Sequence, residues 1–213
     1  MGPKKIFVTG GAGYVGSRLI PYLIEKGFDI TVIDTLWFGN YLAPHERLTI
    51  IEEDIRNISY LELPKVDTVI HLANIANDPA VDLSPVLSWE TNVLAGYKLI
   101  EKCVSIGAQQ FIYASSGSVY GVKSEPKVTE DLDLVPISAY NKTKMIAERV
   151  FKSFSDKLTV HNIRPATVCG YSPRMRLDVA VNLLTMQALE TGIIKVLGGN
   201  QIRPNIHIDD ITD

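Results

Sequence analysis

Tyr140 and Lys144 are four residues apart, which places them one turn apart on the same face of a helix. A lysine ammonium close to a phenol favours the phenolate, so we expect the pKa of Tyr140 to fall below its ordinary value of about 10. Tyr140 could then take a proton from a hydroxyl group and return it. The same spacing occurs on solvated helices, so it gains weight only from its combination with Ser116, whose hydroxyl follows an apolar run and could bond the same oxygen.

Closely spaced glycines form a second group, in the stretch Thr-Gly-Gly-Ala-Gly-Tyr-Val-Gly-Ser at residues 9–17, between an apolar strand and a helix. We expect Gly10 to adopt backbone angles closed to other residues and Gly13 to let a pyrophosphate approach. We expect Gly16 to let the helix pack on its strand, and the helix N-terminus offers N–H groups to an anion. A glycine turn without a ligand is the alternative. The expected contacts are Gly10, Gly13, Tyr14, Val15 and Gly16.

Asp34 ends the second apolar run, about 20 residues beyond the glycines. A carboxylate at this position binds the ribose hydroxyls of a dinucleotide and would repel the additional phosphate of NADP. The sequence therefore favours NAD.

The composition indicates one globular domain: 213 residues, 46% of them hydrophobic, can bury a substantial core. No run reaches the 18 or more apolar residues of a membrane span, and residues 1–5 lead straight into a strand without a secretory segment. We therefore expect a cytoplasmic protein with no membrane association. A net charge of −3, with both signs interspersed, gives no basic face for nucleic acid.

Neither the cysteines nor the histidines indicate a metal site. Cys103 and Cys169 lack the spacing of metal ligands and are expected to be buried thiols. The four histidines are scattered, and His71 and His161 lie in apolar strand patterns, where a hydrogen-bonded core histidine is the more frequent case.

Strands and helices alternate along the chain, which is typical of a parallel sheet with helical crossovers. We therefore predict an α/β fold with a Rossmann-like doubly wound parallel sheet, in which ligands sit outside the carboxyl ends of the strands. The expected strands are residues 6–9, 30–34, 48–52, 68–73, 110–116, 158–164 and 195–197. The expected helices are residues 14–26, 88–106, 138–154 and 178–191, and residues 201–210 are expected to be extended.

The chain resembles the extended short-chain dehydrogenase/reductase family, in particular its NAD-dependent nucleotide-sugar epimerase/dehydratase group. The resemblance covers nearly the whole chain. It rests on the glycine stretch, on Tyr-x-x-x-Lys at 140–144, and on the segments 54–56, 71–73, 92–96, 115–121, 164–170 and 203–210.

The resemblance implies a role for each matching residue. Ser116, Tyr140 and Lys144 would be the catalytic triad, and Asn92 would hold the structure behind it and contact the cofactor side, with helix capping or packing as the alternative. The further cofactor contacts would be Asp54 and Ile55 at adenine, Leu72 and Ala73 at the ribose side, and Pro165 at the nicotinamide. The substrate contacts would be Ser116, Ser118, Asn182 and Arg203.

Two departures from the family pattern affect these expectations. Dehydratases of the group carry Thr-Asp-Glu where this chain has Ser-Gly-Ser at 116–118, so a 4,6-dehydratase is disfavoured. Relatives continue for roughly another hundred residues. We therefore expect residues 1–170 to form the NAD-binding and catalytic domain, and residues 171–213 to begin a substrate-binding lobe that is incomplete here, either because the chain is a fragment or because a partner covers the face.

The resemblance implies a nucleotide-sugar epimerase that works through a transient ketosugar, with Tyr140 as acid and base. A nucleotide-sugar dehydrogenase or ketoreductase with net turnover of NAD would use the same residues. A non-catalytic dinucleotide-binding protein is a third possibility. A homodimer built from the helices at 88–106 and 138–154 is also expected.

Overall fold

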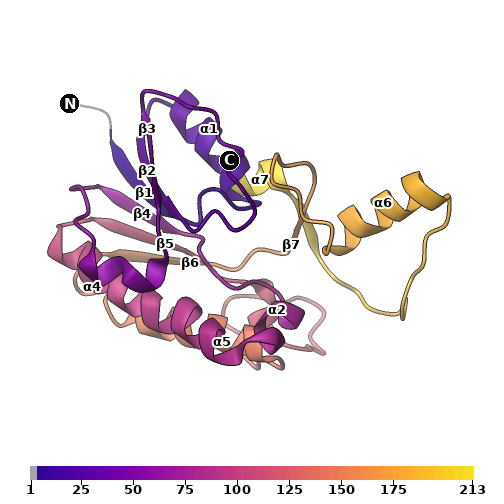
Figure 1. Ribbon diagram of the computed structural model, residues 1–213. Helices are drawn as coiled ribbons and strands as arrows, with labels where there is room; N and C mark the ends of the chain where they lie inside the picture. Colours follow the sequence, from indigo (N-terminus) through magenta and orange to yellow (C-terminus); the bar gives the residue numbers. More distant parts are fainter. Residues whose placement is uncertain (1–3) are drawn as a thin grey trace.

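The computed structural model describes residues 4–213 and contains a six-stranded parallel sheet in the order β3-β2-β1-β4-β5-β6 (Figure 1). Residues 1–3, which belong to the start that was interpreted as lacking a secretory segment, lie outside the described part. The strands are β1 (Lys5–Thr9), β2 (Asp29–Asp34), β3 (Leu48–Glu52), β4 (Thr68–His71), β5 (Gln110–Ala114) and β6 (Thr159–Ile163).

Helices cover both faces of this sheet because side chains alternate along each strand (Figure 1). Ile6 and Val8 of β1 pack with α1 (Gly16–Glu25) in one buried cluster. Phe7, between them, joins the opposite cluster with α4 (Ala95–Ser105) and α5 (Ala139–Lys152). The predicted Rossmann-like doubly wound sheet is confirmed.

The strand order reverses direction between β1 and β4, so a crevice opens at the carboxyl ends of these two strands. The glycine stretch follows β1, and residues 72–76 follow β4. Both segments therefore border the place where this fold binds its ligands.

The long helix expected at 88–106 consists of three segments: α3 (Pro85–Trp89), a π-helical segment η2 (Glu90–Leu94) and α4. A π-helical turn widens the helix locally and is frequent at functional sites. Short elements missing from the sequence prediction are η1 (Ile55–Tyr60), α2 (Asp78–Leu83), η3 (Gly117–Tyr120), strand β7 (Thr167–Cys169) and helix α7 (Ile208–Thr212). The expectation of an extended segment over residues 201–210 was wrong from residue 208 on, where α7 begins.

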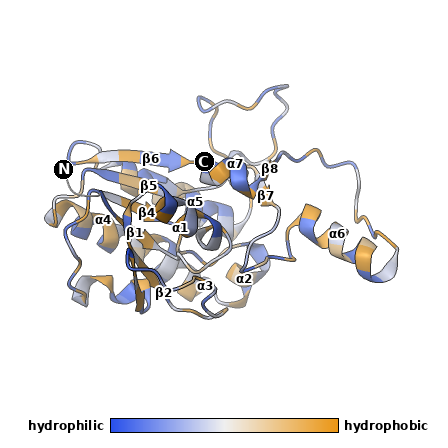
Figure 2. Ribbon diagram, turned by 90° about the horizontal axis from the view of Figure 1, so that it is seen from above, coloured by the Kyte–Doolittle hydropathy of each residue, from blue (hydrophilic) through white to orange (hydrophobic). Residues whose placement is uncertain are grey.

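The last part of the chain runs away from the sheet and returns (Figure 2). Its helix α6 (Ala180–Thr191) stands off from the layers, while β7 (Thr167–Cys169) and β8 (Asn205–His207) pair in parallel and α7 (Ile208–Thr212) packs on α1. The prediction of a strand at residues 195–197 was wrong: this stretch is an exposed connection without regular structure.

None of the helices in residues 4–213 has the length and hydropathy needed to cross a membrane.

Candidate active site

Three glycines of the turn after β1 lie where a side chain would collide with neighbouring atoms. Gly10 has φ +71°, and a Cβ there would lie 2.6 Å from the Ala73 nitrogen. A Cβ on Gly16 would collide with the backbone of Gly11, and one on Gly11 would lie 2.7 Å from the Val32 side chain. Gly11 therefore lets the turn close on strand β2, and Gly16 lets α1 close on the turn, which corrects the expectation that Gly16 meets the strand.

Gly13 is different, because a Cβ there would meet only the Gly10 carbonyl oxygen, at 3.2 Å, among the described residues. The turn is therefore open at Gly13, where a pyrophosphate would approach the N-terminus of α1. Val15 is the N-cap of α1 and lies beside this opening. These residues fit a dinucleotide.

Asp34 lies where predicted, at the end of β2, and connects two backbone segments. One carboxylate oxygen accepts a hydrogen bond from the Ala12 nitrogen at 3.0 Å and the other from the Leu36 nitrogen at 2.9 Å. These bonds fix the carboxylate beside the glycine turn. This is the position from which it can hold ribose hydroxyls.

Asp54 begins η1 beside the end of β3. Its carboxylate accepts bonds from the Arg56 backbone and guanidinium, at 2.8 and 3.0 Å. Burial acts to raise the pKa of Asp54, but the Arg56 hydrogen bonds outweigh it and the pKa is lowered. Ile55 is buried beneath this edge, so the Asp54 carboxylate is charged and Ile55 is part of the core.

The segment after β4 is fixed to β1 through Thr9. The Ala73 nitrogen, which follows Leu72, donates to the Thr9 hydroxyl at 3.2 Å, and that hydroxyl bonds the Nδ1 atom of His71 at 2.7 Å. Burial, with a smaller contribution from Lys144, lowers the pKa of His71 to about 3, so this histidine is neutral. The prediction of a hydrogen-bonded core histidine is confirmed for His71.

His161 does not follow that prediction. It lies on β6, at the edge of the sheet, and is exposed. An edge strand has its outer positions open to solvent, and the apolar pattern around His161 did not reveal that β6 is at the edge. Of the cysteines, Cys103 is buried as predicted and Cys169 is partly buried.

Tyr140 and Lys144 lie on one face of α5, with the Lys144 ammonium 5.8 Å from the centre of the Tyr140 ring. The ammonium donates to the Ala114 carbonyl oxygen at the end of β5, at 2.6 Å. Lys144 is 4% exposed, and burial lowers its pKa to about 7. Burial likewise raises the pKa of Tyr140 to about 12. The expected lowering was wrong for this arrangement, because desolvation outweighs the lowering effect of the Arg176 charge.

A buried ion pair lies one turn further along α5. Glu148 is 3% exposed and accepts hydrogen bonds from Arg164 at 2.7 to 3.1 Å, together with one from the Ser115 hydroxyl. Arg164 also donates to the Tyr120 hydroxyl at 2.8 Å. This network joins α5, the end of β5 and η3, and so fixes the backbone that carries Tyr140 and Ser116.

Ser116 is the N-cap of η3, immediately after β5. Its hydroxyl accepts from the Ser118 nitrogen at 3.2 Å and lies 2.7 Å from the Ser118 hydroxyl. The Ser118 hydroxyl in turn donates to Oδ1 of Asn141, the residue after Tyr140, at 2.6 Å. The two serines and the tyrosine helix are therefore connected by side-chain hydrogen bonds.

Asn92 is fully buried in the π-helical segment. Its amide exchanges hydrogen bonds with the Ile75 backbone at 2.8 and 3.1 Å and donates to the Thr143 hydroxyl at 3.1 Å. Both N–H donors of the amide are used within the protein. Asn92 thus ties the segment after β4 to α5, which agrees with the structural alternative.

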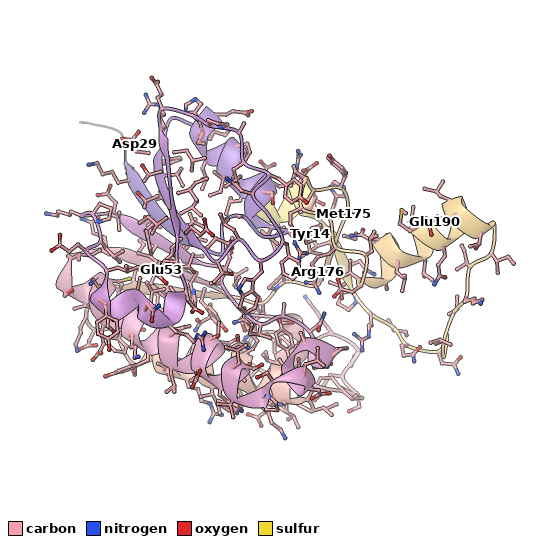
Figure 3. All side chains as sticks on the ribbon, viewed as in Figure 1. Tyr14, Asp29, Glu53, Met175, Arg176 and Glu190 are labelled. Atoms are coloured by element: carbon pink, nitrogen blue, oxygen red, sulfur yellow. The ribbon has the colours of Figure 1, made fainter. Side chains whose placement is uncertain are left out.

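Asn182 and Tyr14 join the C-terminal segment to the glycine turn. The Asn182 amide donates to the Tyr14 hydroxyl and to the Arg176 carbonyl oxygen, and it accepts from the Gly170 nitrogen. The Tyr14 hydroxyl donates to the Gly170 carbonyl oxygen at 2.8 Å. Figure 3 shows Tyr14 and Arg176 close together where this segment meets the sheet. Both amide donors of Asn182, a predicted substrate contact, are thus already used inside the protein.

Two further predicted contacts, Pro165 and Arg203, lie in different surroundings. Pro165 accepts a hydrogen bond from the Gly117 nitrogen at 2.8 Å and so borders η3. Arg203 is exposed on the connection between α6 and β8, and it stays a prediction. Within residues 4–213, no three His, Cys, Asp or Glu side chains are grouped to hold a metal ion.

Two residues near Tyr140 were missed by the sequence interpretation. Arg176 is an additional cation that acts to lower the pKa of Tyr140, and its guanidinium is held by Asp178 at 2.6 Å. Asn141 lies within the Tyr-x-x-x-Lys motif. It was overlooked because only the ends of that motif were considered, whereas Arg176 had no signal in spacing.

Comparison with known proteins agrees with this geometry. A family model described as NAD dependent epimerase/dehydratase family matches residues 6–213. An uncharacterised UDP-glucose epimerase of Bacillus subtilis is 32% identical over 227 residues, which cover 97% of this chain and 69% of that protein.

Solved structures are also similar. UDP-N-acetylglucosamine 4-epimerase from Methanobrevibacter ruminantium M1, in complex with UDP-N-acetylmuramic acid, is 30% identical, with a TM-score of 0.87, and the match covers 100% of this chain and 71% of that one. UDP-glucuronic acid 4-epimerase from Bacillus cereus, in complex with UDP-glucuronic acid and NAD, is 31% identical, with a TM-score of 0.84, covering 98% and 70% of the two chains.

Proposed function

Because this chain belongs to the NAD dependent epimerase/dehydratase family of enzymes, whose cofactor is NAD, we propose that it is a nucleotide-sugar epimerase. The relatives named above are epimerases of UDP-sugars, which supports a substrate of that class. The proposed reaction oxidises one ring hydroxyl to a transient ketosugar and reduces it again with inverted configuration.

The observation that carries the proposal is the convergence of three side chains at the end of β5. Lys144 is held against the Ala114 carbonyl oxygen, Tyr140 lies one turn before it, and Ser116 is linked to the same helix through Ser118. This is the arrangement needed to remove a proton from a hydroxyl and to return it.

Each residue has a defined task in that reaction. NAD, when bound at the glycine turn and Asp34, supplies reversible hydride acceptance. Tyr140 takes the hydroxyl proton as the alcohol is oxidised and returns it at the end. The protonated form of Lys144, whose pKa is about 7, stabilises the phenolate of Tyr140, and the Ser116 hydroxyl orients the sugar oxygen. The net consumption of NAD is zero.

The segment 116–118 favours an epimerase over a 4,6-dehydratase. The dehydratases of the family carry an acidic pair at positions 117 and 118, which are Gly and Ser here. A Cβ on Gly117 would lie 3.1 Å from the Pro165 carbonyl oxygen, so the turn has little room for an aspartate. The chain lacks that acid and base pair in the sequence, and its backbone is packed accordingly.

The test is incubation of the full chain with NAD and a panel of UDP-sugars, following absorbance at 340 nm and separating the sugar products. The expected result is an epimerised sugar without accumulated NADH. NADH that accumulates with a ketosugar would assign a dehydrogenase instead. NAD binding with neither product would contradict the proposal.

The matched variants are Tyr140→Phe and Tyr60→Phe. Tyr140→Phe removes one hydroxyl and is expected to lower kcat by about 10²–10⁴-fold while NAD still binds. Tyr60 is 85% exposed, so Tyr60→Phe removes the same group at the surface and should leave turnover unchanged. Full activity in Tyr140→Phe would exclude Tyr140 as the acid and base.

We further propose that residues 1–170 carry NAD binding and catalysis and that residues 171–213 contribute to the substrate site, since Asn182 and Ser172 hydrogen-bond Tyr14 in the glycine turn. A homodimer is also proposed, through helix α5 and the helical segments α3, η2 and α4. Light scattering at micromolar concentration measures it, and a monomer would contradict it. The segments carry the exposed apolar side chains Val86, Trp89, Leu94 and Tyr97.

A further inference from the structure

Asn141 follows the proposed acid and base directly, and its side chain points to the serines. The Ser118 hydroxyl donates to Oδ1 of Asn141 at 2.6 Å, while the hydroxyls of Ser116 and Ser118 lie 2.7 Å apart. The Ser118 nitrogen also donates to the Ser116 hydroxyl, at 3.2 Å. These bonds form one chain that leads from the Tyr140 helix to Ser116.

The number of protons fixes the direction of that chain. A serine hydroxyl has one proton to donate and two lone pairs to accept with. The proton of Ser118 goes to Asn141, so the bond between the two hydroxyls must use the proton of Ser116. In this arrangement Ser116 has no proton left for a substrate oxygen.

A ketone oxygen only accepts hydrogen bonds, so Ser116 must donate to it. Ser116 can do so if Ser118 accepts a hydrogen bond from another group and donates its own to Ser116 or to solvent. The asparagine amide can donate that hydrogen bond, because its Nδ2 carries two N–H groups and a half turn of the amide exchanges Oδ1 for Nδ2. An aspartate or an alanine at this position could not serve both directions at neutral pH.

We propose that Asn141 is a positioning residue whose amide sets the direction of the Ser116–Ser118 hydroxyl pair, and thereby whether the Ser116 proton points away from the substrate oxygen or toward it. The proposal rests on the proposed epimerase reaction, in which the same oxygen alternates between an alcohol and a ketone. Asn141 contacts neither substrate nor cofactor in this account; it acts through Ser118.

The test is the pH profile of kcat for Asn141→Asp. A carboxylate only accepts, so the Ser116 proton stays committed to Ser118, and we expect kcat to fall about 10²-fold at pH 8, the cost of one lost donor to a developing charge. A protonated carboxyl can donate again. The ratio of wild-type to variant kcat should therefore shrink as the pH is lowered from 8 to 5, while the Kd for NAD is unchanged.

Lys142→Ala is the matched control, because Lys142 is the next residue on α5 and is exposed. It should show the wild-type kcat at every pH. Asn141→Ala removes the acceptor without adding a charge and should give a smaller loss with the pH profile of the wild type. It also provides a readout if Asn141→Asp does not fold.

The Ser118→Ala background separates this role from a general effect on folding. Without the Ser118 hydroxyl the chain is broken, so substitution of Asn141 should have no further effect on kcat, whereas a purely structural loss would add. Additive losses, a pH-independent ratio, or kcat within twofold of the wild type would overturn the inference. Turnover that requires Tyr140 would leave the proposed function intact in those cases, and a wild-type chain without turnover would overturn both.

Discussion

The region around α5 and the segment 171–213 differ in how deeply their side chains are buried. Around α5, Lys144, Glu148 and Asn92 are almost fully buried, and each has partners on other elements. In the later segment, α6 stands away from the sheet and most of its side chains are exposed (Figure 1). The residues proposed for proton transfer therefore lie where many contacts fix their positions. The segment 171–213 is instead held to the rest of the chain by a few polar contacts, which we call tethers.

The largest expected effect tests the buried side of this comparison. Glu148→Ala leaves Arg164, whose side chain is 19% exposed, without its carboxylate. An uncompensated charge of this kind costs about 3–5 kcal/mol, so urea unfolding should show that loss. The same change at Arg149, an exposed neighbour on α5, should cost less than about 0.5 kcal/mol. Equal effects at the two positions would show that the buried pair is not critical.

The second effect is a pH dependence caused by Lys144. Burial disfavours its charged form and lowers its pKa from 10.5 to about 7. Between pH 7 and 9 the unfolded chain therefore binds more protons at this lysine than the folded chain, and the free energy of unfolding rises with pH. The rise attributable to Lys144 is on the order of 2 kcal/mol.

Lys144→Met removes this titration while keeping a long apolar side chain. Urea unfolding at pH 7, 8 and 9 should show a slope for the wild type and a smaller one for the variant. Identical slopes would mean that Lys144 is charged in the folded protein throughout this range.

The third effect tests the tether between the regions. Asn182→Ala removes the bonds to Tyr14, Gly170 and Arg176 and should cost roughly 1.5 kcal/mol, since buried partners lose their hydrogen bonds. Hydrogen exchange should accelerate in α6 more than in β1 or β4. Uniform acceleration across the sheet would show that the two regions unfold as one unit.

The same contrast explains what the sequence could predict. The apolar strands, the glycine turn and Asp34 were predicted because their types follow from local backbone and packing rules, as Gly10 at φ +71° illustrates. The strand prediction failed at residues 195–197, because their apolar pattern has no strand to pair with in the described structure.

Within the site, residue positions were predictable but their electrostatics were not. The spacing of Tyr140 and Lys144 placed them on one face, but the raised pKa of Tyr140 depends on desolvation by elements distant in the sequence. The amide bonds of Asn92 and Asn182 likewise depend on partners at Thr143 and Tyr14. Such contacts cannot be read from spacing within one element.

The smallest expected effect concerns the second tether, the ion pair between Arg18 of α1 and Asp209 of α7. The Arg18 guanidinium lies 2.6 Å from the carboxylate, but the side chains are 41% and 54% exposed. A pair in solvent is screened and loses side-chain freedom, so Arg18→Ala should lower the free energy of unfolding less than Asn182→Ala does, and less again in 0.5 M salt. Asp209→Asn is the matched change on the partner, and the double variant should cost no more than either alone. A loss comparable to that of Asn182→Ala would place Arg18 and Asp209 among the principal tethers and weaken the contrast between the two regions.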